Sequence, residues 1–275
     1  MLFDRRRVTL KSAAQIERMA SAGRLVGEAL DAVGEAIRPG VAPLHLDAVA
    51  SEVIRSQGGI PSFIGVPGPR GPFAHTLCVS IDDEVVHGVP DDRPIRDGQL
   101  VSVDCGAIVD GWHGDSARTW LIGSVPVAAT ELSEATRQAM LAGVAAAWPG
   151  NSLEDVAAAI EDVGLAHGYG IVRAYVGHGI GNEMHEEPQV TNYRTGRKGR
   201  RIEAGLCIAI EPMFTLGGHE TRVKADGWTV ATADGSLAAH WEHTIAVTAD
   251  GPRILTLSHG TAPDGAALAA GAHAR

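Results

Sequence analysis

A predicted β-hairpin constrains the fold of this chain more than any other feature. Its strands, Leu100–Gly106 and Trp112–Trp120, flank a segment that contains Asp110-Gly111, and an Asp-Gly pair is a strong signal for a two-residue hairpin turn. With the turn at this pair, Asp104 and Asp115 come within two residues of direct opposition. Like charges on neighbouring strands destabilise a sheet, so we expect a cation or a proton between them. Two solvated acids at a sheet edge are the alternative.

Two more acids lie in apolar segments of the second half of the chain. Glu211 ends an apolar run just before a proline, and Glu242 lies within the predicted strand Ala238–Val247. We expect this strand to form a hairpin with Gly227–Thr232 around Asp234-Gly235. A bare carboxylate is costly to bury. Both acids therefore need a partner.

Three histidines lie in segments that favour strand ends. His178 and His185 belong to the stretch Gly177–Pro188, whose glycines oppose a helix and favour a loop or bulge between strand ends. Glycines there also let the backbone approach a bound ligand. His87 is expected at a strand end, next to Gly88. Solvated imidazoles in a turn, and a structural role for His87, are the alternatives.

The four carboxylates and His178 together suggest a metal site. Four carboxylates carry four negative charges, which two divalent cations would neutralise. Oxygen-rich ligation with one nitrogen suits Co, Mn, Fe or Zn and does not choose among them. Two such cations activate water and polarise a carbonyl, which is the chemistry of amide hydrolysis.

Helix signals indicate two related halves, each a helix pair followed by strands. A capping box at Ser12 and Gln15 starts the first helix, and a Pro-Gly pair ends one helix in each half. The four predicted helices run from Ser12 to Pro39, over Leu46–Ser56, over Ser133–Trp148 and over 151–164. We expect one catalytic domain at 1–258, with halves at about 12–125 and 130–256, and a disordered tail at 259–275.

Composition limits the class of protein. With a net charge of −10, the 275-residue chain is a poor general binder of nucleic acid. Its three cysteines (Cys78, Cys105 and Cys207) are scattered and odd in number, which argues against a disulfide framework and for a reducing cytoplasm. No apolar run is long enough to span a bilayer, and the charged start lacks the apolar core of a signal peptide.

Taken in order, these residues resemble those of type I methionine aminopeptidases from roughly Val8 to Thr256. The resemblance implies an α/β (α+β) pita-bread fold: two pseudo-symmetric halves, a curved antiparallel sheet and helices outside. It also implies a cytoplasmic metalloprotease of protein maturation. Such an enzyme removes the initiator methionine from nascent polypeptide N-termini with a small second residue, by attack of a metal-bridging hydroxide on the scissile carbonyl. The motifs are Val86-His87-Gly88-Val89-Pro90, Asp104, Gly111-Trp112-His113-Gly114-Asp115, Gly177-His178-Gly179-Ile180-Gly181, Met184-His185-Glu186-Glu187-Pro188, Ile210-Glu211-Pro212-Met213 and Trp241-Glu242-His243-Thr244.

The resemblance also implies a set of five metal ligands. Asp104 matches the chelating ligand of one metal. Asp115 and Glu242 match the bridging ligands, and His178 and Glu211 complete the second metal.

Three residues match catalytic positions of the family. The counterpart of Glu211 is the proposed proton shuttle. His185 matches the histidine that hydrogen-bonds the scissile amide or its tetrahedral intermediate, and His87 matches the one that contacts the amide near the leaving nitrogen.

The substrate pocket departs from the family pattern. Cys78 and Trp228 match positions around the methionine side chain, with plain core as the alternative for Cys78. Met184 stands where many relatives have an aromatic residue. The loop 65–73 is longer and lacks the expected tyrosines, so that only Phe73 takes such a role. We therefore expect an altered pocket shape.

Two other functions stay open from the sequence alone. One is an X-Pro aminopeptidase or dipeptidase of the same fold, although those enzymes usually carry a separate N-terminal domain. The other is a non-catalytic binding relative, although such proteins usually lose metal ligands. We expect a monomer with no DNA or membrane partner, and the basic loop 194–201 is interpreted either as solvated surface or as a ribosome contact.

Overall fold

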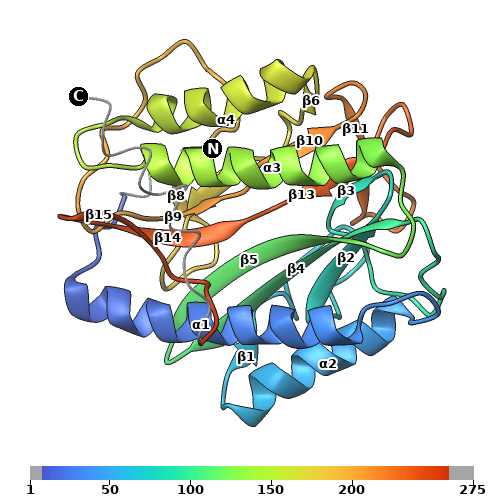
Figure 1. The fold of residues 1–275 in the computed structure, drawn as a ribbon. Coiled ribbons are helices and arrows are strands. Elements are labelled where there is room, and N and C mark those ends of the chain that lie inside the picture. The colour runs from blue at the N-terminus through green and yellow to red at the C-terminus, as the bar shows by residue number, and fades with distance from the viewer. Residues whose placement is uncertain (1–7, 260–275) are drawn as a thin grey trace.

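Strands form the middle of the molecule and helices cover it on both sides. The computed structural model describes residues 8–259, so that the charged start and nearly all of the predicted tail lie outside the described residues. Helices α1 (Ala13–Ala36) and α2 (Pro43–Ser56) lie on one side of the strands, and α3 (Val127–Ala146) and α4 (Leu153–His167) lie on the other (Figure 1). None of the described helices is long and apolar enough to cross a membrane.

The helices of the first half begin where local sequence signals place them. Ser12 and Gln15 form the predicted capping box of α1, with the Gln15 N–H donating to Ser12 Oγ and the Ser12 N–H donating to Gln15 Oε1. Helix α2 begins at Pro43, before the predicted Leu46. A proline fits the first turn because its missing N–H needs no partner there, and the prediction did not use this signal.

The start of α3 was predicted too late. The helix begins at Val127, and the expected start at Ser133 is a buried interior position. The Ser133 hydroxyl accepts a hydrogen bond from the Trp241 indole at 3.1 Å instead of capping a helix. Helix α4 has a capping box between Ser152 and Asp155 and ends at a left-handed Gly168, so that its predicted start is confirmed.

All paired strands run antiparallel. The largest sheet of the second half has the order β15-β14-β9-β7-β8. In the main sheet of the first half, β5 pairs along one edge of β4, and β2 and β1 pair one after the other along its opposite edge. The strands are β1 (Ile60–Pro61), β2 (Leu77–Ile81), β3 (Glu84–Val86), β4 (Leu100–Val109), β5 (Trp112–Leu121), β6 (Gly170–Ile171), β7 (Gly177–Gly179), β8 (Glu186–Val190), β9 (Cys207–Ile210), β10 (Met213–Thr215), β11 (Thr221–Val223), β12 (Val230–Thr232), β13 (Ala238–His240), β14 (His243–Thr248) and β15 (Gly251–Ile254).

The hairpin of β4 and β5 has the predicted register. Asp110 and Gly111 form the turn with φ of 50° and 77°, both in the left-handed region that this turn requires. Asp104 pairs with Ala117, and Asp115 pairs with Gly106. The two acids are therefore two positions apart along the ladder, as expected.

The predicted hairpin around Asp234-Gly235 is wrong. Strand β12 pairs with β11 and β3, whereas β13 pairs with β10. The Asp234 carboxylate accepts hydrogen bonds from the Gly218 N–H and the Ser236 hydroxyl, which tie the turn to the loop after β10. Glu242 also lies between β13 and β14 rather than within one continuous strand.

Two apolar cores hold the strands in place. One packs α1 and α2 against β2 and β4 through residues such as Leu30, Leu46 and Val103. The other packs α3 and α4 against β9, β10 and β14, with Phe214 and Ile160 fully buried. The polar residues considered next lie between these cores. The predicted limits of the two halves remain a prediction.

Candidate active site and metal centre

The structure brings every predicted site residue to one cavity of about 180 Å³. These residues come from both halves and from segments far apart in the sequence, so that only the fold joins them. The prediction missed two apolar members, Phe63 and Val66, which precede and begin the loop 65–73. The predicted members of the lining are Phe73, Cys78, His87, Asp104, Asp115, His178, Met184, His185, Glu211, Trp228 and Glu242.

Hydrogen bonds from β5 to the start of β14 and to Glu242 just before it hold two of the acids together. The Asp115 N–H donates to Thr244 Oγ1 at 3.1 Å, and the same hydroxyl donates to the Asp115 carbonyl at 2.8 Å. The Glu242 N–H donates to the Ala117 carbonyl at 2.9 Å. These bonds fix both carboxylates in the interior, where Asp115 and Glu242 are 4% and 2% exposed.

His178 faces the carboxylates with a lone pair. Its Nδ1 lies 2.9 Å from the Gly179 carbonyl, which can only accept, so Nδ1 carries the hydrogen of the neutral ring. Burial, reinforced by His185, lowers the pKa of His178 to about 3 and keeps the ring neutral. Its Nε2 then points an acceptor at Glu211 Oε1 (3.5 Å) and Asp115 Oδ2 (3.9 Å). Acceptors that face one another in this way need a proton or a cation between them.

Several buried oxygens support the same conclusion. Asp104 Oδ1, Asp115 Oδ1 and Glu242 Oε1 have no hydrogen-bond partner among the described residues. Ligand atoms of Asp115, His178 and Glu242 lie within 4.8 Å of one another. Unpartnered buried acceptors are costly, and a divalent cation satisfies them. The residues present therefore fit the metal site predicted from the sequence.

The carboxylates also repel one another. Burial raises the pKa of Asp104 to about 7 even though a hydrogen bond with Asp115 lowers it. Burial and then neighbouring carboxylates raise the pKa of Asp115, Glu211 and Glu242 well above the ordinary range of an acid. In the absence of a cation, the cluster would therefore hold protons near neutral pH.

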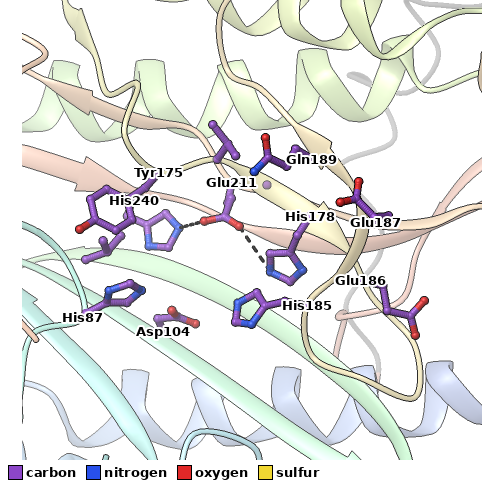
Figure 2. A pocket seen from close by; sticks show the side chains of 13 residues that line it. His87, Asp104, Tyr175, His178, His185, Glu186, Glu187, Gln189, Glu211 and His240 are labelled. Carbon is purple, nitrogen blue, oxygen red and sulfur yellow. Dashed lines mark ion pairs between the residues drawn. The ribbon is translucent and has the colours of Figure 1, made fainter. Parts of the chain in front are cut away.

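Two histidines flank the acidic cluster. His87 follows β3 with φ of 58°, and its ring contacts Tyr175 edge to face at a centroid distance of 5.5 Å. Burial lowers the pKa of His87 to about 4, so that this ring is neutral at physiological pH. The His185 ring lies 4.4 Å from the His178 ring. Figure 2 shows the His87 and His185 rings on either side of Asp104.

A second, polar cavity of about 370 Å³ adjoins the first. The two cavities share His87, Asp104, His178, His185 and Glu211. Tyr175 and His240 are among the lining residues that were not predicted from the sequence. One signal for His240 was available, because it lies two residues before Glu242, and alternation along a strand places such a pair on one face.

The apolar end of the first cavity is built around Trp228. Its indole contacts the Phe73 ring edge to face at a centroid distance of 5.0 Å, beside Cys78. A Cβ at Gly68 would lie 2.0 Å from the indole, so the loop can close on Trp228 only with a glycine there. Loop 65–73 thus supplies Val66 and Phe73 to the apolar wall.

Comparisons with known proteins identify the family. A sequence model of metallopeptidase family M24 matches residues 17–249. The chain belongs to this family. It is 49% identical to methionine aminopeptidase 1 of Mycobacterium tuberculosis, over 93% of this chain and 97% of that protein. It is 43% identical to a methionine aminopeptidase of Clostridium acetobutylicum, over 91% and 99% of the two chains.

Solved structures of the M24 family confirm the pita-bread fold. The methionine aminopeptidase of Rickettsia prowazekii superposes with a TM-score of 0.88 at 36% identity, covering 91% of this chain and all of that one. A prolidase of Pyrococcus horikoshii superposes with a TM-score of 0.73 at 24% identity, and the match spans 64% of its length. The prolidase therefore shares the fold, whereas the methionine aminopeptidase matches along its whole chain.

Metal binding should weaken on acidification. Below its pKa of about 7, Asp104 carries a proton that a cation must displace, whereas His178, with a pKa of about 3, stays deprotonated. Affinity should therefore fall as pH drops through about 7, by roughly tenfold per pH unit for each proton displaced. Titration calorimetry with Mn²⁺ at about pH 7.5, 6.5 and 5.5 measures this trend. Equal affinity at all three pH values would refute the protonated cluster.

Proposed function

We propose that the protein is a methionine aminopeptidase that removes the N-terminal methionine from nascent polypeptides with a small second residue. One observation carries the proposal: an apolar cavity of thioether size opens directly onto the four carboxylates and His178. The cavity accepts an uncharged side chain, and the acidic cluster lies at its end. Identity of 40–49% over at least 90% of this chain to three methionine aminopeptidases, among them that of Mycobacterium tuberculosis, supports the same activity.

The apolar wall would hold the methionine side chain. Cys78, Met184 and Trp228 offer sulfur and aromatic surfaces, which favour contact with a thioether. Phe73 packs on the Trp228 indole and closes the pocket on the side of loop 65–73. Burial in this pocket also removes water from the N-terminal side of the scissile bond.

The polar residues would position the amide and move its protons. His87 and His185 face the same space and, as neutral rings, can each donate one hydrogen bond to the scissile amide. Glu211 would accept a proton from the attacking water at its carboxylate and return it to the leaving nitrogen. Burial and the charges of Asp104 and Asp115 raise its pKa, so that it takes up a proton more readily than an ordinary glutamate does.

Asp104, Asp115, His178, Glu211 and Glu242 would hold the metal. We propose two divalent cations (Co, Mn, Fe or Zn), since four carboxylates carry a charge that two such ions neutralise. When bound, the cations supply a polarised carbonyl and water of lowered pKa. The residues of the chain do the rest: they bind the side chain, orient the amide and carry the proton.

The structure modifies the case for a ribosome contact. Within loop 194–201, Arg194 pairs with Glu161 and Asp162, and Arg200 pairs with Glu203. Arg197 and Lys198 are exposed, and we propose that they contact ribosomal RNA. Reversing both charges to glutamate should reduce co-sedimentation with ribosomes, and unchanged co-sedimentation would leave the loop as solvated surface. We also propose a monomer in the cytoplasm, where the three free cysteines stay reduced.

Peptide hydrolysis tests the activity and its nearest rival together. The metal-loaded protein should release methionine from Met-Ala-Ser and leave Ala-Pro-Ser intact, because the apolar pocket selects the first residue. Released amino acids can be separated and quantified by chromatography. Cleavage of the X-Pro peptide alone would overturn the proposal in favour of an X-Pro aminopeptidase. Metal binding without hydrolysis of either peptide would favour a non-catalytic relative.

A further inference from the structure

His240 is a buried histidine for which the proposed reaction has no role. Its side chain lies in the wall of the polar cavity, at the end of β13, and the residue is 2% exposed. Its Nε2 has no hydrogen-bond partner among the described residues. The same atom lies 3.8 Å from Glu211 Oε2, on the side of that carboxylate away from His178 (Figure 2).

Hydrogen bonds and strand pairing fix the backbone of His240 and so the point from which its side chain extends. The His240 N–H lies within hydrogen-bond distance of Ser102 Oγ (3.3 Å) and Thr119 Oγ1 (3.2 Å), and the Thr119 hydroxyl donates to the His240 carbonyl at 2.7 Å. His240 on β13 pairs with Met213 on β10, and Met213 is two residues after Glu211. The backbone of His240 is therefore anchored to the segment that carries Glu211.

The backbone of Glu211 is held by a hydrogen bond as well, whereas no hydrogen bond joins its carboxylate to another of the described residues. The Asn192 side-chain amide donates to the Glu211 carbonyl at 3.1 Å. The carboxylate has a different nitrogen on each side, with His178 Nε2 at 3.5 Å from Oε1 and His240 Nε2 at 3.8 Å from Oε2. When Glu211 is the ionised carboxylate that ligates metal, neither Oε1 nor His178 Nε2 carries a hydrogen, so these two atoms cannot form a hydrogen bond. The remaining candidate donor is His240.

We propose that His240 is a positioning residue for Glu211. Its Nε2–H donates to Glu211 Oε2 after a small approach and turns Oε1 toward Asp115 and His178. An imidazole carries at least one N–H, and a hydrogen on Nε2 gives this buried nitrogen the partner that it lacks among the described residues. Partners of this kind orient ligating carboxylates and tune how tightly they bind metal. The inference rests on the role of Glu211 in the proposed function.

Three substitutions of His240 test whether an N–H group must reach Glu211 Oε2 or whether any polar side chain is sufficient. His240→Gln keeps an N–H at a similar distance from the backbone. His240→Asn is polar but too short to reach Oε2, and His240→Leu fills the space without a donor. His45→Leu replaces an exposed histidine on α2 and serves as the control. Circular dichroism and the melting temperature establish that each variant folds.

Two measurements read the effect, and one of them is independent of activity. Calorimetric titration of the metal-free proteins with Mn²⁺ should show affinity lowered roughly 10- to 100-fold in His240→Leu and His240→Asn. For Met-Ala-Ser hydrolysis at saturating metal, kcat should fall by a similar factor while KM changes little. His240→Gln should restore most of both quantities, and His45→Leu should match the wild type.

Each outcome bears on the proposal. Wild-type affinity and kcat in His240→Asn would overturn it, and this variant decides the question even if His240→Leu does not fold. Failure of His240→Gln to restore either quantity would also overturn it, because the imidazole itself would then be required. If the wild type does not hydrolyse Met-Ala-Ser, the proposed function is refuted. If Mn²⁺ affinity nevertheless falls in His240→Leu and His240→Asn and returns in His240→Gln, the positioning role of His240 still holds.

Discussion

Glu211→Gln should lower kcat for Met-Ala-Ser by about 10²- to 10⁴-fold, the usual contribution of a general acid–base group. The carboxylate lines both cavities and lies 3.5 Å from His178 Nε2, next to where the scissile amide would lie. Burial and the charges of Asp104 and Asp115 raise its pKa, which favours uptake of a proton by this carboxylate. Glutamine keeps the shape and loses the proton exchange. Steady-state kinetics at saturating Mn²⁺ measure the loss.

The matched control for this variant is Glu131→Gln, an exposed glutamate on α3. It makes the same chemical change far from the cavity and should keep the wild-type rate. Saturation with metal must be verified for Glu211→Gln, because its amide is a weaker ligand than a carboxylate. An undiminished kcat in the metal-saturated variant would remove Glu211 from the proton-transfer step.

Asp115→Ala should abolish both metal binding and hydrolysis. Asp115 is 4% exposed, shares a hydrogen bond with Asp104 and lies within 4.8 Å of the ligand atoms of His178 and Glu242. Loss of a partner outside the ligand set costs about 10- to 100-fold in metal affinity, so loss of this central carboxylate should cost more than about 100-fold. Elemental analysis of protein dialysed against Mn²⁺ measures the effect. Two retained equivalents would contradict the bridging role.

Asp115→Asn should stabilise the metal-free protein although it weakens metal binding. Asp115 has a raised pKa in the folded protein, so its contribution to stability is lost as pH rises through that pKa. At about pH 8, the metal-free asparagine variant should therefore melt at a higher temperature than the metal-free wild type, because the mutual repulsion is gone. Added Mn²⁺ should stabilise the wild type and leave the variant unchanged.

Local sequence signals predicted those parts of the fold that are formed by residues close together in the chain. The turn at Asp110-Gly111 sets the register of β4 and β5, and that register alone places Asp104 near Asp115. The supposed hairpin at Asp234-Gly235 failed because β12 and β13 each pair with strands remote in sequence. A turn motif cannot report such partners, since the same residues serve any tight turn.

Some residues of the candidate site were likewise predicted from the sequence, and others were found only in the structure. The resemblance to a known family supplied the predicted ligands, and the structure places them around one cavity. It did not supply Phe63, which precedes loop 65–73, or Val66, which lies within this loop where the chain departs from the family pattern. Nor did it supply His240, whose nearness to Glu211 depends on the pairing of β10 with β13. Residues brought together only by non-local pairing carry no signal in their own segment.

Anomalous diffraction from crystals grown with Mn²⁺ tests most directly whether cations hold the acidic cluster together. Two anomalous peaks should lie among the side chains of Asp104, Asp115, His178, Glu211 and Glu242, because their charges and unpartnered oxygens require that much positive charge. A single peak would contradict the paired site. Peaks only elsewhere on the protein would contradict the whole account.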